Sequence, residues 1–147
     1  MTTVACSLVT KSMAADSQCS QGRSIYRVSK IIRLKNNGGL LSTAGSRYLT
    51  GAFEAEFKRG VTDPAKPEVP DGEDEFEALW LRPDGIWLFD CSFYSERIAG
   101  DFAAIGTGGS VAMSHLFDGL TPEQAVLRAC RVDPNSSAPV HNETLGA

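Results

Sequence analysis

The chain of 147 residues lacks the features that mark membrane-embedded or exported proteins. No apolar run approaches the roughly 18 residues that a membrane-spanning helix needs. The first nine residues, MTTVACSLV, contain neither a basic stretch nor a cleavage site, so we expect no signal peptide. We therefore expect a cytoplasmic protein.

Cysteine is scarce, and its spacing excludes two further classes. The four cysteines form no C-x-x-C pair, which argues against a zinc site or a disulfide framework. They are Cys6, Cys19, Cys91 and Cys130. We expect all four to be reduced and most of them to be buried, in a protein without a metal or cofactor.

A strong overall charge is also absent. The net charge of −4 gives no global field that would attract nucleic acid or an anionic membrane. The length and the 42% apolar content fit one globular domain spanning residues 1–147. The negative charge is local, because residues 61–77 contain seven acids and one lysine. Three prolines in the same segment predict an exposed acidic loop over residues 61–75.

The pattern of apolar residues predicts groups of strands and groups of helices. Strands are expected at residues 2–9, 13–19, 25–34, 40–44, 76–81, 86–93, 102–105 and 138–142. Helices are expected at residues 46–59, 110–117 and 122–133, the last behind a capping box that begins at Thr121. Residues 2–9 and 13–19 form one expected hairpin, and residues 76–81 and 86–93 form another. Segregated runs of this kind favour an α+β fold with antiparallel sheets.

The second residue carries the chemistry of greatest interest. If Met1 is removed, Thr2 becomes an N-terminus that opens directly into a strand. A threonine hydroxyl is a weak nucleophile, and a free α-amine on the same residue can act as its base. That amine titrates near pH 8 when unperturbed, which is close to operating pH. A Met-Thr start is common, so this feature alone does not separate a nucleophile from an ordinary N-terminus.

Short motifs along the chain strengthen the first interpretation. They are Thr2-Thr3-Val4-Ala5, Met13-Ala14-Ala15-Asp16-Ser17, Val28-Ser29-Lys30-Ile31, Thr43-Ala44-Gly45, Ala104-Ile105-Gly106-Thr107-Gly108-Gly109, Ala125-Val126, Ala129-Cys130 and Asp133-Pro134-Asn135-Ser136. In this order and spacing they resemble the proteasome β-subunit family, most of all its HslV-type peptidase. The resemblance runs from residue 2 to about residue 142 and is poor over residues 61–100. It implies the N-terminal nucleophile (Ntn) hydrolase fold, a four-layer αββα sandwich of two antiparallel sheets.

The resemblance also implies a catalytic site. Thr2 would be the nucleophile, Lys30 the cation beside its amine, and Asp16 the acid that pairs with Lys30. From the residues alone, Lys30 could equally be a solvated strand charge. Asp16 is more telling, because an acid in a covered strand needs a cationic partner.

Four further positions complete the implied site. Thr107 stands where the family usually has serine, and its hydroxyl would bond the N-terminal amine. Asp133 and Ser136 would orient the N-terminus, although both also suit a plain turn after a helix. The backbone N–H of Ser42 would be the oxyanion donor, at a position where the family generally has glycine. The glycine-rich stretch 106–109 would read alone as a helix entry or an anion-binding turn.

The implied function is that of a threonine endopeptidase acting through an acyl-enzyme. The family works as stacked rings fed by an ATP-dependent unfoldase ring, so the resemblance implies a homo-oligomeric ring and unfolded polypeptide as substrate, with no nucleic acid or membrane partner. The acidic loop 61–75 stands where the family has a second long helix, so ring packing or unfoldase docking would differ. Two alternatives stay open: an inactive structural or assembly subunit that retains Met1, and an amidase acting on a small molecule.

Overall fold

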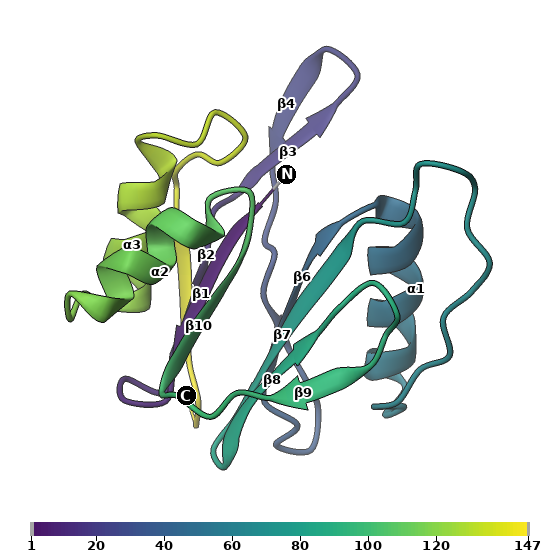
Figure 1. Cartoon of the computed structure of the whole chain (residues 1–147), viewed down its shortest axis with the longest axis horizontal. Helices are drawn as coiled ribbons and strands as arrows, with labels where there is room; N and C mark the ends of the chain where they lie inside the picture. Colours follow the sequence, from purple (N-terminus) through teal and green to yellow (C-terminus); the bar gives the residue numbers. More distant parts are fainter. Residues whose placement is uncertain (1, 147) are drawn as a thin grey trace.

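The structure is a computed structural model, and it describes residues 2–146. Two antiparallel sheets face each other (Figure 1). The first sheet has the order β10-β1-β2-β11, formed by Phe102–Gly106, Thr3–Ser7, Ser12–Ala15 and His141–Thr144. The second has the order β5-β6-β7-β8-β9, formed by Ile32–Arg33, Leu40–Gly45, Phe76–Arg82, Gly85–Phe89 and Ser95–Arg97.

Helices cover the outer faces of both sheets. Helices α2 (Gly109–Phe117) and α3 (Pro122–Cys130) lie on the first sheet, and α1 (Arg47–Lys58) lies on the second (Figure 1). The molecule is therefore an αββα sandwich, as the resemblance implied. Strands β3 (Gln18–Gln21) and β4 (Ser24–Arg27) form a separate two-stranded sheet outside these layers.

The central strands have apolar residues on both faces, because alternate residues of each strand enter different hydrophobic cores. On β1, Val4 faces the core between the two sheets, while Ala5 faces the core under α2 and α3. On β6, Leu40 faces the core between the sheets and Leu41 faces α1. Each sheet is covered on both sides, so apolar residues occupy both faces of the central strands.

The helices begin where their sequence signals lie. The Ser46 hydroxyl accepts a hydrogen bond from the Tyr48 amide at the start of α1. On that helix Leu49, Phe53 and Phe57 are buried, which confirms the predicted apolar stripe. The capping box of α3 is formed in both directions between Thr121 and Gln124.

The prediction of one continuous strand over residues 13–19 is wrong. The segment is divided into β2 and β3 at Asp16-Ser17. The Asp16 side chain accepts the amides of Thr3 and Gln18, and such local bonds compete with a regular strand ladder.

The predicted strand over residues 25–34 is also divided, because β4 ends at Arg27 and β5 begins at Ile32. These two pieces belong to different sheets. The strand expected at residues 138–142 lies later, at β11. Strand β9 was not predicted, since its three exposed residues show no apolar alternation.

The cysteines, the segment between α1 and β7, and the length of the helices were further subjects of prediction. All four cysteines are free, but only Cys6 is fully buried and Cys91 is exposed, so the expectation of mostly buried cysteines is wrong. Residues 59–75, between α1 and β7, form neither helix nor strand. Within residues 2–146, no helix combines the length and apolar character needed to cross a membrane.

Candidate functional site

The N-terminal strand lies in the middle of the first sheet. Strand β1 pairs with β10 on one side and β2 on the other, and Thr2 immediately before it is only 7% exposed. Gly106 lies against Thr2, since a Cβ at Gly106 would lie 1.8 Å from the Thr2 carbonyl oxygen. The backbone of Thr2 is thus held at the start of a strand that is paired on both edges. The predicted removal of Met1 concerns a residue outside those that the structure describes.

Three of the predicted site residues meet at Thr2. The Lys30 Nζ donates to the Thr2 Oγ1 at 3.1 Å and to the Asp16 Oδ1 at 2.9 Å. The Asp16 side chain is fully buried, and that of Lys30 is 10% exposed. The ion pair that a buried strand acid led us to expect is therefore formed, and it holds a cation against the threonine hydroxyl.

Asp16 is fixed by more than its ion pair. Its Oδ1 also accepts the Thr3 amide at 3.0 Å, while its Oδ2 accepts the amides of Gln18 at 3.1 Å and Ser137 at 3.2 Å. Four donors thus surround one carboxylate. This network compensates the burial of the charge and aims Lys30 at Thr2.

The predicted residues Thr107, Asp133 and Ser136 form a second cluster beside β1. The Asp133 Oδ2 accepts both hydroxyl groups at 2.6 Å, and the Ser136 Oγ lies 2.7 Å from the Thr3 Oγ1. Burial raises the pKa of Asp133, but the hydrogen bonds from Ser136, Thr107 and the Asn135 amide outweigh it and leave the pKa lowered. An ionised Asp133 therefore holds the turn after β10 and the loop after α3 against the start of β1.

A pocket of about 410 Å3 opens beside Thr2. Lys30 and Thr2 line one side, and α1 contributes Thr50 and Glu54. The Thr43 hydroxyl donates to the Glu54 carboxylate at 2.6 Å. This pocket could accept a side chain of a substrate whose backbone passes over Thr2.

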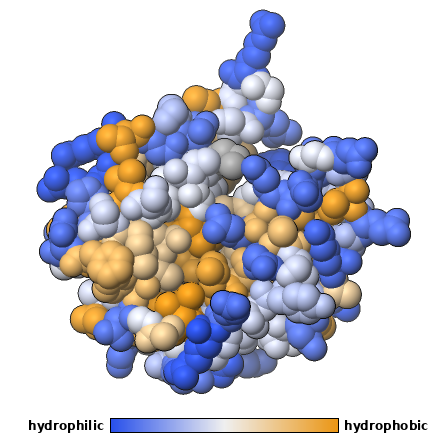
Figure 2. Space-filling view, viewed as in Figure 1, coloured by the Kyte–Doolittle hydropathy of each residue, from blue (hydrophilic) through white to orange (hydrophobic). Residues whose placement is uncertain are grey.

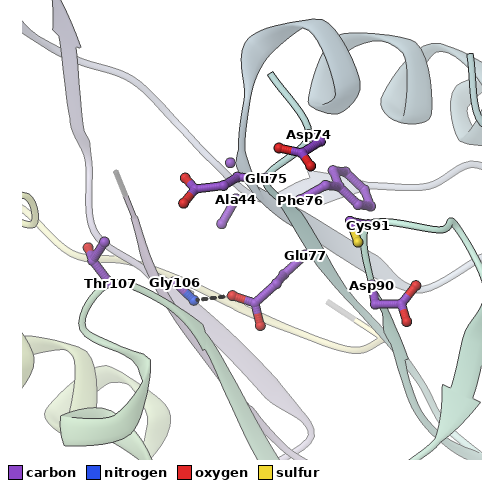
Figure 3. Close-up of a pocket in the computed structure, with 10 residues that line it drawn as sticks. Ala44, Asp74, Glu75, Phe76, Glu77, Asp90, Cys91, Gly106 and Thr107 are labelled. Atoms are coloured by element: carbon purple, nitrogen blue, oxygen red, sulfur yellow. Dashed lines mark hydrogen bonds between the residues drawn. The ribbon is translucent and has the colours of Figure 1, made fainter. Parts of the chain in front are cut away.

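A second pocket, of about 490 Å3, also borders the end of β6, at Ala44 and Gly45 (Figure 3). Acidic residues line much of it, and the Glu77 carboxylate accepts the Gly106 amide at 3.4 Å. The acids in its lining are Asp74, Glu75, Glu77 and Asp90. Hydrogen bonds from Ser92 lower the pKa of Asp90, which keeps that carboxyl charged. Local negative charge thus borders the end of β10.

Ser42, the predicted oxyanion donor, is fully buried in the middle of β6 and lines neither of these pockets. Its hydroxyl donates to the Lys30 carbonyl at 2.6 Å. The Ser46 amide donates to the Glu75 carbonyl on the β7 side, and antiparallel alternation directs the Ser42 amide toward β7 as well. The same alternation directs the Gly45 amide toward the opposite edge of β6.

The sequence did not single out Ser137 or Glu54. Ser137 donates its amide to Asp16 and its hydroxyl to Gln18, and neither contact leaves a periodic or spacing signal. Glu54 lies on α1, a helix that the sequence predicted from its apolar residues alone. Within residues 2–146 no three metal-ligating side chains gather, and the buried Cys6 has its pKa raised to about 12 by desolvation.

Comparison with known proteins gives structural matches. No protein-family model and no curated protein matches the sequence. BPH, a bacterial proteasome homologue, from Thiobacillus denitrificans in complex with epoxomicin superposes with a TM-score of 0.71 at 18% identity, over 99% of this chain and 100% of that one. Eukaryotic HslV from Trypanosoma brucei gives 0.67 at 19% identity, over 96% and 97%.

The Gly-1 mutant of Anbu from Hyphomicrobium sp. strain MC1 gives a TM-score of 0.72 at 11% identity, over 97% of this chain and 80% of that one. At these identities the likeness concerns the fold. This chain has the proteasome-type Ntn-hydrolase fold of HslV, BPH and Anbu, and the fold predicted from the sequence resemblance is confirmed.

Proposed function

We propose that the protein is a threonine-type endopeptidase whose nucleophile is Thr2 after removal of Met1. The observation that carries this proposal is the contact of Lys30 Nζ with both Thr2 Oγ1 and Asp16 Oδ1, at 3.1 and 2.9 Å. A buried, fixed cation beside a terminal hydroxyl supports nucleophilic catalysis, because it disfavours protonation of a neighbouring amine and stabilises developing negative charge.

The reaction begins with attack of the Thr2 Oγ1 on a peptide carbonyl carbon. The hydroxyl proton passes to the α-amine of Thr2, which then delivers it to the leaving nitrogen as the C–N bond breaks. The product is an ester between Thr2 and the acyl part of the substrate. Water attacks this ester with the amine again as base, which releases the carboxylic acid and restores Thr2.

For the oxyanion, the strand register favours Gly45 over Ser42. The Ser42 amide is directed into the ladder with β7, whereas β5 covers the opposite edge of β6 only at Leu40 and Leu41. The Gly45 amide is directed toward that edge, and Gly45 lines the pocket that contains Thr2. An amide fixed in a strand and left without a strand partner suits a developing oxyanion.

The remaining polar cluster would set the position of the N-terminus. Asp133 holds Ser136 and Thr107, and Ser136 contacts Thr3, the residue after the nucleophile. We assign these residues a positioning role. A peptidase of this kind would act on unfolded polypeptide as a homo-oligomeric ring in the cytoplasm, supplied by an ATP-dependent unfoldase, as the sequence resemblance implies.

The test is peptide hydrolysis by the chain after its mass has shown whether Met1 is absent. Thr2→Ala should abolish turnover of a fluorogenic peptide, and Lys30→Ala should lower kcat by at least about 100-fold. Arg33→Ala is the matched control, because Arg33 pairs with the exposed Glu143 and does not line the pocket that contains Thr2, so kcat should be unchanged. Full activity of Thr2→Ala would rule the peptidase out. A chain that retains Met1 and hydrolyses nothing would instead identify the structural subunit.

A further inference from the structure

One face of α1 forms a wall of the pocket that contains Thr2. Arg47, Thr50 and Glu54 line this pocket at intervals of three and four residues. Residues at that spacing share one face of a helix, and Arg47 and Glu54 are two turns apart, about 10 Å along the axis. Arg47 begins the helix, two residues after Gly45. Glu54 therefore lies at the end of the wall that is remote from Gly45.

Glu54 is fixed there by a hydrogen bond from the second sheet. Thr43 faces α1, as does Leu41 two residues before it on β6, and Thr43 is only 7% exposed. The Thr43 hydroxyl donates to the Glu54 Oε1 at 2.6 Å. Among residues 2–146, the Glu54 Oε2 has no hydrogen-bond donor and Glu54 forms no ion pair. One oxygen of the half-buried carboxylate is held in place while the other is available to a ligand.

The rest of the pocket lining is mostly small or polar. The β3–β4 hairpin, the hydrophilic projection at the top of Figure 2, borders the pocket with Gln18, Cys19 and Ser20. Among the described residues, those that line the pocket include no aromatic ring and no leucine, isoleucine or methionine. A large apolar side chain would find few apolar groups to contact here, so its burial would contribute little to binding.

Two cations also line the pocket, and each has a partner. Lys30 is paired with the buried Asp16 at 2.9 Å. Arg47 is exposed, and its Nη2 donates to the Cys19 Sγ at 3.1 Å. Water and salt screen an exposed charge more than a half-buried one. Glu54 therefore sets the charge at its end of the pocket, two turns away from Arg47.

We propose that Glu54 selects an arginine or a lysine at P1, the substrate residue whose carbonyl carbon Thr2 attacks. With the oxyanion at Gly45, a P1 side chain that enters the pocket follows α1 toward Glu54. The long side chains of the substrate residue and of Glu54 together span the two turns of the wall. The cation then donates to the Glu54 Oε2 in a charge-assisted hydrogen bond, which is stronger than a neutral one. This inference rests on the proposed function, because it takes Thr2 as the nucleophile.

Fluorogenic peptides that differ only at P1 measure this selection. Arginine, norleucine and glutamate at P1 compare a cation, a neutral chain and an anion. The unmodified chain should cleave the arginine peptide with a kcat/KM at least about tenfold above that of the norleucine peptide, and the glutamate peptide most slowly. Glu54→Gln keeps an acceptor oxygen for Thr43 and removes the charge. In this variant kcat/KM for the arginine peptide should fall to within about threefold of the norleucine value, which should itself stay unchanged.

Three further variants separate the charge of Glu54 from its other contacts. Glu54→Asp keeps the charge and should retain part of the preference for arginine. Arg47→Gln removes a competing cation and should increase that preference. The matched control is Glu56→Gln, because Glu56 lies on the same helix, pairs with Arg59 and does not line the pocket, so the preference should be unchanged. Circular dichroism checks that each variant is folded.

Binding without turnover distinguishes this inference from the proposed function. In Thr2→Ala, the fluorescence anisotropy of dye-labelled peptides that end in arginine or norleucine gives their dissociation constants. The arginine peptide should bind at least about tenfold more tightly, and adding Glu54→Gln should remove the difference. If this result is found but an unmodified chain that begins at Thr2 hydrolyses no peptide, the selection by Glu54 is supported and the peptidase is ruled out.

The opposite outcome concerns Glu54 alone. Equal kcat/KM values for the arginine and norleucine peptides, a preference for glutamate, or a preference for arginine that persists in Glu54→Gln would each overturn the proposal. Because all three results require peptide hydrolysis, they would leave the assignment of Thr2 as nucleophile intact.

Discussion

Replacing Asp16 with asparagine removes one charge from the most heavily bonded side chain of the site. In the structure its Oδ1 accepts from Lys30 and Thr3, and its Oδ2 accepts from Gln18 and Ser137. Asparagine offers one acceptor oxygen and one donor NH2 group in the same volume. Whichever way the amide lies, two of the four donors then face another donor.

The expected cost follows from burial. Asp16 is fully buried and Lys30 is nearly so, and breaking a buried ion pair by removing one partner costs about 3–5 kcal/mol. For a chain of this size that loss lowers Tm by about 6–20 °C. Lys30→Met should cost less than Asp16→Asn, because the carboxylate keeps three backbone donors.

Urea denaturation followed by tryptophan fluorescence and by circular dichroism gives the free energy of unfolding. Both tryptophans lie in the second sheet, so agreement of the two probes checks that the two sheets unfold together. Asp101→Asn is the matched control at an exposed carboxylate and should change stability by less than about 0.5 kcal/mol. An Asp16→Asn cost below about 1 kcal/mol, or a cost smaller than that of Lys30→Met, would refute the reasoning.

Three other predictions follow from the cysteines, Asp133 and Gly106. In the native protein at pH 8, iodoacetamide should modify the exposed Cys91 and leave Cys6, whose pKa is raised to about 12 by burial; mass mapping that finds Cys6 modified as fast as Cys91 would contradict this. Asp133→Asn should destabilise the fold by about 1–3 kcal/mol at pH 7. Because the pKa of Asp133 is lowered in the folded protein, its ionised carboxylate stabilises the fold above about pH 4, and this stabilisation is lost as the pH falls through the folded pKa. The free energies of unfolding of the unmodified chain and of Asp133→Asn should therefore converge in acid. Gly106→Ala should cost more than Gly119→Ala in thermal unfolding, because both have φ near +90° but only Gly106 would place its Cβ against the Thr2 carbonyl; equal costs would show that the close approach is unimportant.

The α+β class with antiparallel sheets was predictable from the segregated runs of strands and helices, whereas the four layers were implied by the resemblance to the proteasome β-subunit family. Leu49, Phe53 and Phe57 were identified from helical spacing alone, and the structure buries all three. The break at Asp16-Ser17 was not predicted, since residues 13–19 contain no glycine or proline that would mark a turn. A side chain that draws backbone amides from three directions is a tertiary feature, and propensity does not report it.

The candidate site was predictable to a similar extent. A buried strand acid required a cation, and the structure pairs Asp16 with Lys30, the cation that the family resemblance implied. The oxyanion donor was harder, because the choice between Ser42 and Gly45 depends on which amides of β6 point to its free edge. That direction is fixed by the pairing register with β7, which the sequence leaves undetermined.

The most direct test of the central claim is the covalent state of Thr2. One of the similar structures is a complex with epoxomicin, an epoxyketone, so an epoxyketone is the probe of choice. Peptide mapping by mass spectrometry should find a chain that begins at Thr2 and carries the adduct on its first residue, with no adduct in Thr2→Ala. A native chain that keeps Met1 and stays unmodified, or an adduct that persists in Thr2→Ala, would contradict the assignment of Thr2 as the nucleophile.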